Sequence, residues 1–428
     1  MHDNMKLMKT CGIINPNVDS PLESELVKHA VYNDWKLVIQ LFLHIESYIA
    51  QDLWIPSIHL VKLAKKVDSQ QIVKMLLTLD TNLHLHALKY NEEILEILLE
   101  NGLDVNSLDK NGYMPIHLAA QLDSIKNVQL LIRFGATVNV KGPSGWLELH
   151  LAIFKKRTKI VQFLIESGSD FNAFANGEMP IHIAANSGAF DCVKLLKNYG
   201  ADVNARGLKG WRPIHFSVDK KFTEIVKYLL QNGAKVNSKT DEGSLPIHIA
   251  AQSGCIRIVE LLIEHGANLH AKGSNGWLPL HYAAYFKHFE VAQFIINNGG
   301  NNHSTSDGGH MPIDFAIIYG SESIFKLFTN NGATVRQDSI HMAIKNHCAE
   351  MIKPLVEYGL DINERSGPFG DIAFHEAVKC GCNHCVHALK ECIKFGANTN
   401  MKDDEGKTSL EHALSKGKYD IFKILSQI

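Results

Sequence analysis

Six histidines recur at nearly constant spacing, which makes them the first residues to consider for metal chemistry. Successive members are separated by 33, 32, 33, 33 and 33 residues. Ligands of one metal ion must converge on it, whereas side chains one repeat apart would be stacked about 10 Å from each other, roughly one helix diameter. We therefore interpret these residues as structural, and they are His117, His150, His182, His215, His248 and His281.

A group of thiols near the C-terminal end is the sharpest local candidate for a metal site. Thiolate and imidazole ligands at short spacing can hold zinc. However, the spacing does not match two C-x-x-C pairs, and cysteine also packs well as a small buried hydrophobe. We predict packing or a redox-sensitive loop, and no bound metal. The candidate ligands, if a metal does bind, are Cys380, Cys382 and Cys385, with His384, His387 and Cys392 nearby.

The sequence contains no motif that predicts catalysis. It lacks a nucleophile elbow, a P-loop, an HExxH pair and a dinucleotide-binding fingerprint. Glycine pairs such as Gly299-Gly300 and Gly308-Gly309 fall inside the repeating pattern described next. We therefore predict a protein without catalytic residues or a cofactor.

The elements that must position these residues are set by an internal repeat. The stretch Asp109–Ala120 returns in register with each histidine, and Asp314 holds the equivalent position once more, 33 residues after the last of them. A second phrase follows eighteen residues after the histidine and begins with glycine, as in Gly200-Ala-Asp-Val-Asn204. Proline at the start of the first helix and glycine after the second helix are the preferred residues at those two positions. Each repeat therefore predicts two short helices joined by turns.

These phrases and their common period resemble the ankyrin-repeat family, strongly over about residues 84–428 and more weakly before. The resemblance implies an all-α solenoid of stacked helix-turn-helix units with short β-hairpin fingers. It also implies that each repeated histidine ties its ring to neighbouring backbone. Finger tips and the exposed side of the first helix would form a concave face for partner proteins.

Composition agrees with an ordinary folded protein inside the cell. The chain has 428 residues, 43 basic and 45 acidic side chains and a net charge of −2, so no global field favours nucleic acid or membranes. The start shows no apolar signal region, and no stretch reaches about 18 uncharged apolar residues. Eight cysteines in this pattern indicate reduced thiols. We expect a cytoplasmic protein, with the nucleus or a host cytosol as alternatives.

The repeat pattern also predicts the division of the chain. We expect a flexible tail over 1–21, degenerate capping repeats over 22–82, regular repeats over 83–332, irregular repeats over 333–400 and a C-terminal cap over 401–428. The irregular segment lacks a finger near residue 337, where Asp338 or Ser339 would cap the next helix directly, and carries an insertion near residue 380. Some ankyrin chains end in a degron-adaptor box, but here the capping helix runs to Ser426-Gln427-Ile428, which disfavours that version.

The variable positions are where a partner would bind. The residue after the finger glycine, which we call the finger slot, holds Trp146, Trp211 and Trp277 in every second repeat. Aromatic and cationic residues follow the first helix in the same repeats, and such pairs are favourable contact residues. The candidate protein-binding residues are Tyr113, Trp146, Phe154, Lys155, Arg157, Trp211, Lys220, Lys221, Trp277, Tyr285, Phe286 and Lys287.

We therefore predict a non-catalytic interaction module or scaffold that binds a partner protein, with an acidic or extended segment, on the concave face. The alternatives are a pathogen effector or adaptor that recruits a host protein through the same face, and a purely structural spacer. The aromatics and lysines could also belong to an ordinary solvated surface. Nucleic acid is disfavoured by the net charge and by the lack of an RNA-binding motif. The pattern leaves the oligomeric state open.

Overall fold

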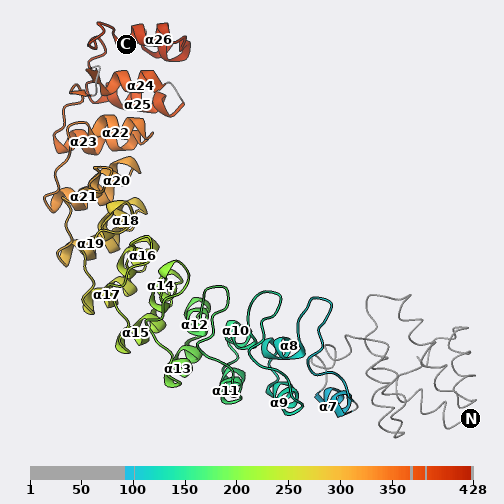
Figure 1. Ribbon diagram of the computed structural model, residues 1–428. Helices are drawn as coiled ribbons and strands as arrows, with labels where there is room; N and C mark the ends of the chain where they lie inside the picture. Colours follow the sequence, from blue (N-terminus) through green and yellow to red (C-terminus); the bar gives the residue numbers. More distant parts are fainter. Residues whose placement is uncertain (1–91, 101, 367–369, 381–382, 426–428) are drawn as a thin grey trace, which may run out of the picture. The chain divides into compact units, whose positions relative to one another are not determined.

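The computed structural model describes residues 92–100, 102–366, 370–380 and 383–425. The predicted tail over 1–21 and the predicted N-terminal caps over 22–82 lie outside these residues. The chain divides into two compact units, Met1–Asp202 and Val203–Ile428, and we describe each by itself. Figure 1 shows the elements of both units coloured along the sequence.

The described part of the first unit consists of a helix followed by three helix pairs. Within each pair the two helices are antiparallel neighbours, and each pair packs on the next. The apolar faces meet in a column of fully buried leucines at equivalent positions, Leu98, Leu131 and Leu164. The helices are α7 (Glu92–Glu100), α8 (Pro115–Gln121), α9 (Ile125–Arg133), α10 (Glu148–Phe154), α11 (Thr158–Glu166), α12 (Pro180–Ser187) and α13 (Phe190–Asn198).

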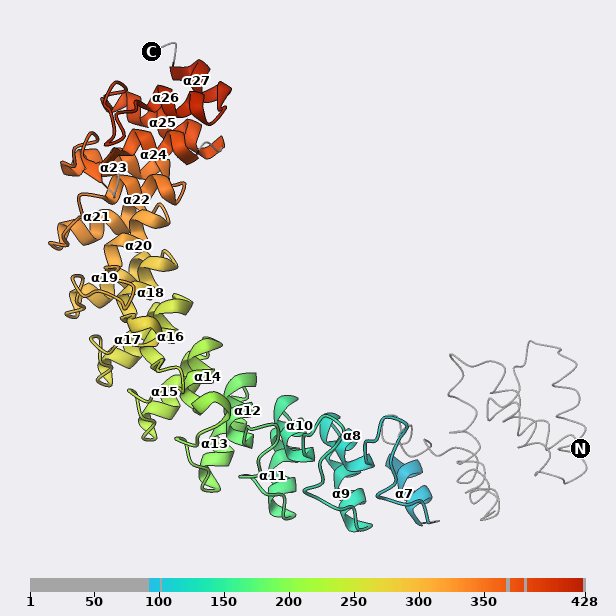
Figure 2. The same ribbon diagram turned by 45° about the horizontal axis from the view of Figure 1, so that its top comes forward.

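The second unit continues the same pattern with seven helix pairs among the described residues. Its even-numbered helices form one row and its odd-numbered helices a second row (Figure 2). The pairs are α14 (Pro213–Asp219) and α15 (Thr223–Gln231), α16 (Pro246–Ser253) and α17 (Ile256–Glu264), α18 (Pro279–Tyr285) and α19 (Phe289–Asn297), α20 (Pro312–Ile318) and α21 (Glu322–Asn330), α22 (Ser339–Lys345) and α23 (Ile352–Tyr358), α24 (Ala373–Cys380) and α25 (Asn383–Lys394), and α26 (Ser409–Ser415) and α27 (Tyr419–Leu425). The second unit also contains three short 3₁₀ turns: η1 (Leu208–Gly210) precedes α14, η2 (Ser274–Gly276) precedes α18 and η3 (Ala349–Met351) precedes α23.

The core of the second unit lies between the two rows of helices. Leu229, Leu262, Ile295 and Phe328 follow one another at intervals of 33 residues, and each is 0% exposed. Truncating a buried side chain of this kind to alanine typically costs about 2–5 kcal/mol. The regular hydrophobic spacing of the second helices therefore supplies the main cohesion between neighbouring repeats.

Asparagines add a polar link between neighbouring repeats. Asn204 donates its side-chain N–H to the carbonyl of Gly233 at 2.9 Å, and its side-chain oxygen accepts from the N–H of Lys235 at 2.8 Å. Asn237 repeats both bonds, to Gly266 and from Asn268. These bonds satisfy backbone groups beyond the C-terminal end of the next repeat's second helix, where helical partners are missing. The closing asparagine of the glycine phrase is therefore an inter-repeat contact, and Asn106, Asn139 and Asn363 make the same pair of bonds.

The predicted β-hairpin fingers are mostly turns in the described residues. Pairing appears as a two-residue ladder between β1 (Arg365–Ser366) and β2 (Asp371–Ile372), and as isolated bridges at Ala175–Glu178 and Lys402–Thr408. The other fingers close through backbone hydrogen bonds such as Gly207 N–H to the Trp211 carbonyl at 2.7 Å. The expectation of hairpin-like fingers is thus met by loop closure more often than by strands.

The missing finger near residue 337 coincides with a change at the repeated histidine position. At His117, His215 and His248 the histidine donates to a carbonyl 23 residues later, as His215 does to Ser238. The equivalent partner of Asp314 would fall at residue 337, where the finger is shortened. The carboxylate of Asp314 needs no acceptor: it accepts from Met311 N–H at 2.8 Å and lies 3.8 Å from Arg336. α22 begins directly after Asp338, which occupies the N-cap position as predicted, although its side chain forms no capping hydrogen bond.

Candidate functional site

The repeated histidines are structural, as predicted. The ring of His248 accepts from the Leu245 N–H at 3.0 Å through Nδ1 and faces the carbonyl of Ala271 at 2.9 Å through Nε2. His117 and His215 make the same two contacts in their own repeats. Burial lowers the pKa of His150, His215, His248 and His281 to about 4, so these rings are neutral at physiological pH. Their role is structural, because each ring connects the start of the first helix to the next finger through hydrogen bonds.

In the first unit, a tryptophan and a phenylalanine form a small aromatic surface. Trp146, in the finger slot, meets the ring of Phe154 at the end of α10 with their centroids 5.4 Å apart. Phe154 is 49% exposed, and the ammonium of Lys155 lies 5.5 Å from its ring centre. Arg157 instead forms an ion pair with Asp123 at 3.2 Å. Three of these four candidates form one exposed surface, and Arg157 serves the packing of neighbouring repeats. Tyr113 fills the finger slot of the repeat before that of Trp146, and its ring packs edge-on against His117.

In the second unit, Trp211 occupies the same slot but has a different aromatic partner. Its ring centroid lies 5.0 Å from Phe216 and 6.0 Å from His215. Lys220 is exposed and pairs with Asp219 at 2.8 Å, whereas no carboxylate among the described side chains lies within ion-pair distance of Lys221. Trp211 is therefore held on the first helix of its own repeat, and the same repeat carries Lys221 in the turn after that helix.

The repeat that contains Trp277 carries the largest aromatic cluster described. Trp277 contacts Tyr282 and Tyr285 of its own repeat, with centroids 5.0 and 5.3 Å away. It also meets Phe315 of the next repeat at 4.6 Å. Tyr285 lies 4.5 Å from Tyr319, and their hydrogen bond raises the pKa of Tyr319 to about 12. We call this set the aromatic cluster; its members are Trp277, Tyr282, Tyr285, Phe286, Phe315 and Tyr319, and Phe286 is 41% exposed.

Three lysines adopt a backbone conformation that glycine adopts in the intervening repeats. Lys156, Lys221 and Lys287 have φ of 59°, 60° and 60° at the turn after the first helix. The same position holds glycine at 188, 254 and 320, with φ of 71°, 73° and 68°. A left-handed residue that carries a Cβ costs roughly 1–2 kcal/mol. Strain of this kind at an exposed side chain is more common at functional sites than on inert surfaces.

The C-terminal repeats carry charges at the positions where earlier repeats carry aromatics. The finger slot holds Asp371 and Lys407, and the residue four after the repeated histidine position is Lys345 and Lys379 in two successive repeats; in the third, where Glu411 takes the histidine position, Lys416 lies one residue further along. We call this second position the helix-end slot. It is occupied by Phe154 and Tyr285 in the aromatic repeats. One pair of positions therefore presents aromatic contacts in one part of the chain and ionic contacts in another.

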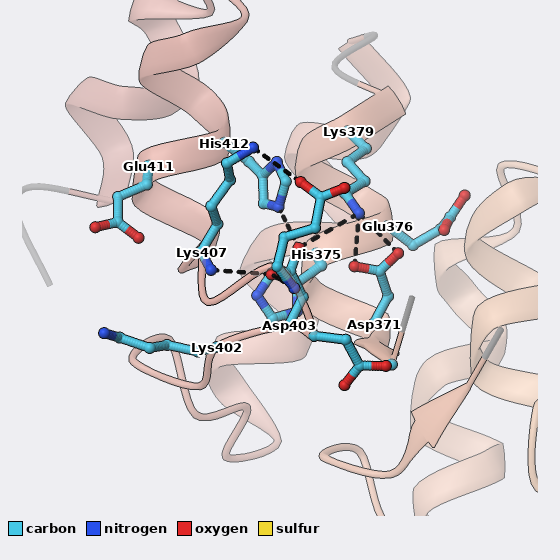
Figure 3. Close-up of polar contacts among 12 residues, drawn as sticks. Asp371, His375, Glu376, Lys379, Lys402, Asp403, Lys407, Glu411 and His412 are labelled. Carbon is cyan, nitrogen blue, oxygen red and sulfur yellow. Dashed lines mark hydrogen bonds and ion pairs between the residues drawn. The ribbon is translucent and has the colours of Figure 1, made fainter. Parts of the chain in front are cut away.

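Figure 3 shows the charged cluster that results. The ammonium of Lys379 lies 2.6 and 2.7 Å from the two oxygens of Asp371 and 3.8 Å from Asp403. Asp403 also lies 2.6 Å from Nε2 of His412. Burial alone would raise the pKa of Asp403, but hydrogen bonds from His412 and the Lys407 N–H outweigh it and lower the pKa to about 2. Oxygen and nitrogen atoms of Asp371, Asp403 and His412 are close enough to hold a metal ion, but the Lys379 ammonium already pairs with both carboxylates.

A pocket of about 490 Å³ opens above this cluster. Lys379 and Asp371 contribute to its wall and join the buried network to the surface. The described lining residues are His341, Lys345, Ser366, Asp371, Glu376, Lys379, Glu405, Lys407, His412, Ser415 and Lys416.

The predicted thiol candidates remain untested. α24 ends at Cys380, and Cys385 lies in the first turn of α25, as the repeat pattern predicted for the start of a second helix. The side chains of Cys380, Cys382 and Cys385 lie outside the described residues. Among the described cysteines, Cys192, Cys255, Cys348 and Cys392 are all free thiols, and burial raises the pKa of Cys392 to about 12.

The residue types alone did not reveal two parts of the surface. Phe216, Tyr282 and Phe315 were missed, although each directly follows the repeated histidine position and could have been found by comparing that column. The charged cluster was missed because Asp371 and Lys379 are ordinary surface residues until the repeat register is applied. In that register they replace the tryptophan and the aromatic partner.

Comparison with known proteins agrees with this geometry. A family model described as ankyrin repeats in three copies matches residues 30–142, 83–175, 149–240, 247–339 and 340–427, and a second ankyrin-repeat model matches residues 220–263. The chain belongs to the ankyrin-repeat family, and its fold is an all-α ankyrin solenoid. Ankyrin repeats are in general protein–protein interaction modules.

Individual relatives share only a short stretch with the chain. It is 34% identical over 82 residues to ankyrin repeat and SOCS box protein 6 of Mus musculus and of Pongo abelii, and 33% identical to that of Homo sapiens. The aligned part covers 18% of this chain and 18% of each relative, so the chain spans less than a fifth of the relatives' length. In the described residues, no helix has the length and apolar character needed to cross a membrane.

Proposed function

We propose that the chain is a non-catalytic scaffold that binds a partner protein through its finger slots and the ends of its first helices. We call these positions the recognition face, which corresponds to the concave face of the ankyrin family. The observation that carries the proposal is that repeats with a half-buried tryptophan in the finger slot also carry a strained lysine after the first helix. Lys221 accompanies Trp211 and Lys287 accompanies Trp277, and each lysine adopts the left-handed conformation that costs nothing for glycine.

The aromatic cluster supplies the contact area. Aromatic side chains present a large surface with little conformational entropy to lose, and are frequent among the residues that dominate binding energy. Trp277 and Phe315 are already fixed against each other at 4.6 Å, so a partner would meet a preorganised surface. Phe286, at 41% exposed, extends the cluster to solvent.

Charge defines the second property of the partner. No carboxylate among the described side chains lies within ion-pair distance of Lys221 or Lys287, so both ammonium groups are available to an acidic segment. Lys220 contributes less, because Asp219 already pairs with it. The free thiols and the resemblance to ankyrin proteins support an intracellular location. An adaptor role, with a second protein recruited through the same face, rests on the partial likeness to a relative whose name includes a SOCS box.

The test compares partner capture by the wild type and a Trp146→Ala/Trp211→Ala/Trp277→Ala variant. Circular dichroism must show equal helicity for both proteins. A matched control replaces two exposed tyrosines away from the recognition face, Tyr358→Ala and Tyr419→Ala, which are 47% and 74% exposed. We expect a partner that the wild type and the control capture and the tryptophan variant loses. Equal capture by all three proteins would refute the proposal, and the absence of any partner would favour the spacer alternative.

A further inference from the structure

The pocket of the C-terminal repeats lies on the same row of first helices as the aromatic cluster. Trp277 and Tyr285 fill the finger slot and helix-end slot of one repeat, and Asp371 and Lys379 fill the same two slots of a later one. α18, α20, α22, α24 and α26 pack successively within the second unit (Figure 2). A partner that follows this row would meet aromatic side chains first and the charged pocket next.

Two of the three acidic side chains that line the pocket are closely paired with neighbouring cations. Asp371 accepts both of its bonds from the Lys379 ammonium at 2.6 and 2.7 Å. Glu405 pairs with Lys407 at 2.8 Å. Glu376 lies 3.9 Å from Lys345, at the outer limit of an ion pair.

The lysines at the mouth of the pocket retain charge for a ligand. Lys345 is 57% exposed along its side chain and makes only that long contact. Lys416 is exposed, and no carboxylate among the described side chains lies within 4.0 Å of its ammonium. The hydroxyl of Ser366 lines the same pocket and can donate to an oxygen of a ligand. The available groups are therefore cations and donors.

A buried network fixes other side chains that line the pocket. Asp403 is fully buried along its side chain and holds His412, while Lys379 is anchored to Asp371 (Figure 3). Lys345 and Lys416 line the pocket from repeats that are two apart. At about 10 Å per repeat this separation is roughly 20 Å, which an extended peptide of about six residues spans.

We infer that this pocket is a second subsite of the recognition face and takes carboxylate side chains from an extended acidic segment of the partner. The inference rests on the proposed function and specifies the partner more closely. An apolar block would contact the aromatic cluster, and an acidic block would contact Lys345 and Lys416. The two sites are separated by about two and a half repeats, or roughly 25 Å, so about eight extended residues would join the blocks.

The direct test uses a fluorescein-labelled hexaglutamate peptide and fluorescence polarisation with the full chain. We expect wild-type binding that weakens between about 20 and 200 mM salt, because the lysines are exposed. Lys345→Glu/Lys416→Glu should weaken binding roughly tenfold or more. The control Lys227→Glu/Lys235→Glu changes net charge equally on exposed lysines outside the pocket and should leave binding within about twofold. An equal loss in both variants, or no binding by the wild type, would overturn the inference.

A second series tests the class of ligand and the spacing. Peptides that join a Leu-Trp-Leu block to hexaglutamate through two to fourteen Gly-Ser residues should bind best near about eight linker residues. Trp277→Ala should weaken these peptides without changing the affinity for hexaglutamate alone. Affinity that is independent of linker length would refute the single-segment arrangement. Oligothymidylate that binds as tightly as hexaglutamate, and is lost in the Lys345→Glu/Lys416→Glu variant, would overturn the acidic-peptide class in favour of nucleic acid.

These results separate the inference from the proposed function. If the tryptophan variant loses its partner while hexaglutamate binds the Lys345→Glu/Lys416→Glu variant as tightly as the wild type, the proposed function stands and the subsite is refuted. If hexaglutamate binds at the pocket and the tryptophan variant still captures every partner, the subsite stands and the tryptophan surface fails.

Discussion

Two adjacent lysines in the second unit should respond oppositely to replacement by glycine. Lys220 follows α14 with φ of −83°, whereas Lys221, the next residue, has φ of +60°. We predict that Lys221→Gly stabilises the folded chain and that Lys220→Gly destabilises it. The backbone bonds of Lys221, from its N–H to Val218 at 3.1 Å and from Thr223 N–H to its carbonyl at 3.0 Å, do not involve the side chain and remain in the variant.

The magnitude follows from the backbone conformation. Removing the Cβ of Lys221 relieves roughly 1–2 kcal/mol of left-handed strain. Glycine also gains conformational freedom in the unfolded chain, which lowers stability by about 0.4–1 kcal/mol. The net gain should be about 0.5–1 kcal/mol. At Lys220 only the unfolded-state term applies, so the variant should lose about 0.5–1 kcal/mol, and its exposed ion pair with Asp219 contributes little.

Urea unfolding followed by circular dichroism measures both changes. Equal m-values are required, because repeat proteins can lose cooperativity and then give no single free energy. Affinity for the partner should fall in Lys221→Gly, so that stability and binding change in opposite directions. Equal destabilisation in the two variants would refute the strain argument. If Lys221→Gly is more stable but binds the partner as tightly as the wild type, the strain argument holds and the link between strain and binding is refuted.

Three further predictions concern buried titratable groups. Lys379→Met should lower the free energy of unfolding by roughly 3 kcal/mol, because it leaves the Asp371 carboxylate without a cation. Amide hydrogen exchange in the last two repeats should then become faster, and unchanged protection would contradict this prediction. Asp314→Asn should stabilise the chain by about 1 kcal/mol at pH 7, because burial raises the pKa of this carboxyl, and the gain should shrink in acid, where the wild-type carboxyl is protonated; urea unfolding at both pH values checks it. The pKa of each buried histidine is lower in the folded chain than in the unfolded chain, so unfolding takes up protons. The free energy of unfolding should therefore be highest above about pH 6.5 and fall as the pH approaches 4. A free energy of unfolding that does not change over this range would be inconsistent with neutral buried rings. These histidines are His150, His215, His248 and His281.

The repeat pattern predicted the helix pairs because each local signal agrees with the global one. Proline at the start of α14 and left-handed Gly233 after α15 mark the ends that the structure shows. The spacing of Leu229 and Leu262 predicts the buried column. In a solenoid each unit contacts mainly its neighbours, so a sequence period translates almost directly into a structural one.

The candidate site was harder to predict because contacts between repeats depend on distances that the period does not contain. The tryptophans were found from their slot, but the contact of Trp277 with Phe315 joins two repeats. Arg157 looked like a free cation and pairs with Asp123 of the preceding repeat. Composition gives no sign of the Asp371–Lys379 pair, since both residue types are common on surfaces. The predicted domain boundaries and the binding residues remain predictions.

The asparagine contacts give the stack a direction. Each asparagine belongs to one repeat, and the two backbone groups that it satisfies belong to the next repeat, as Asn237 shows with Gly266 and Asn268. A repeat that peels away from the C-terminal side leaves behind an asparagine side chain that water can solvate. A repeat that peels away from the N-terminal side removes the side chain and exposes an unpaired carbonyl and N–H on its neighbour. Under mechanical load, repeats should therefore unfold more easily from the C-terminal end than from the N-terminal end.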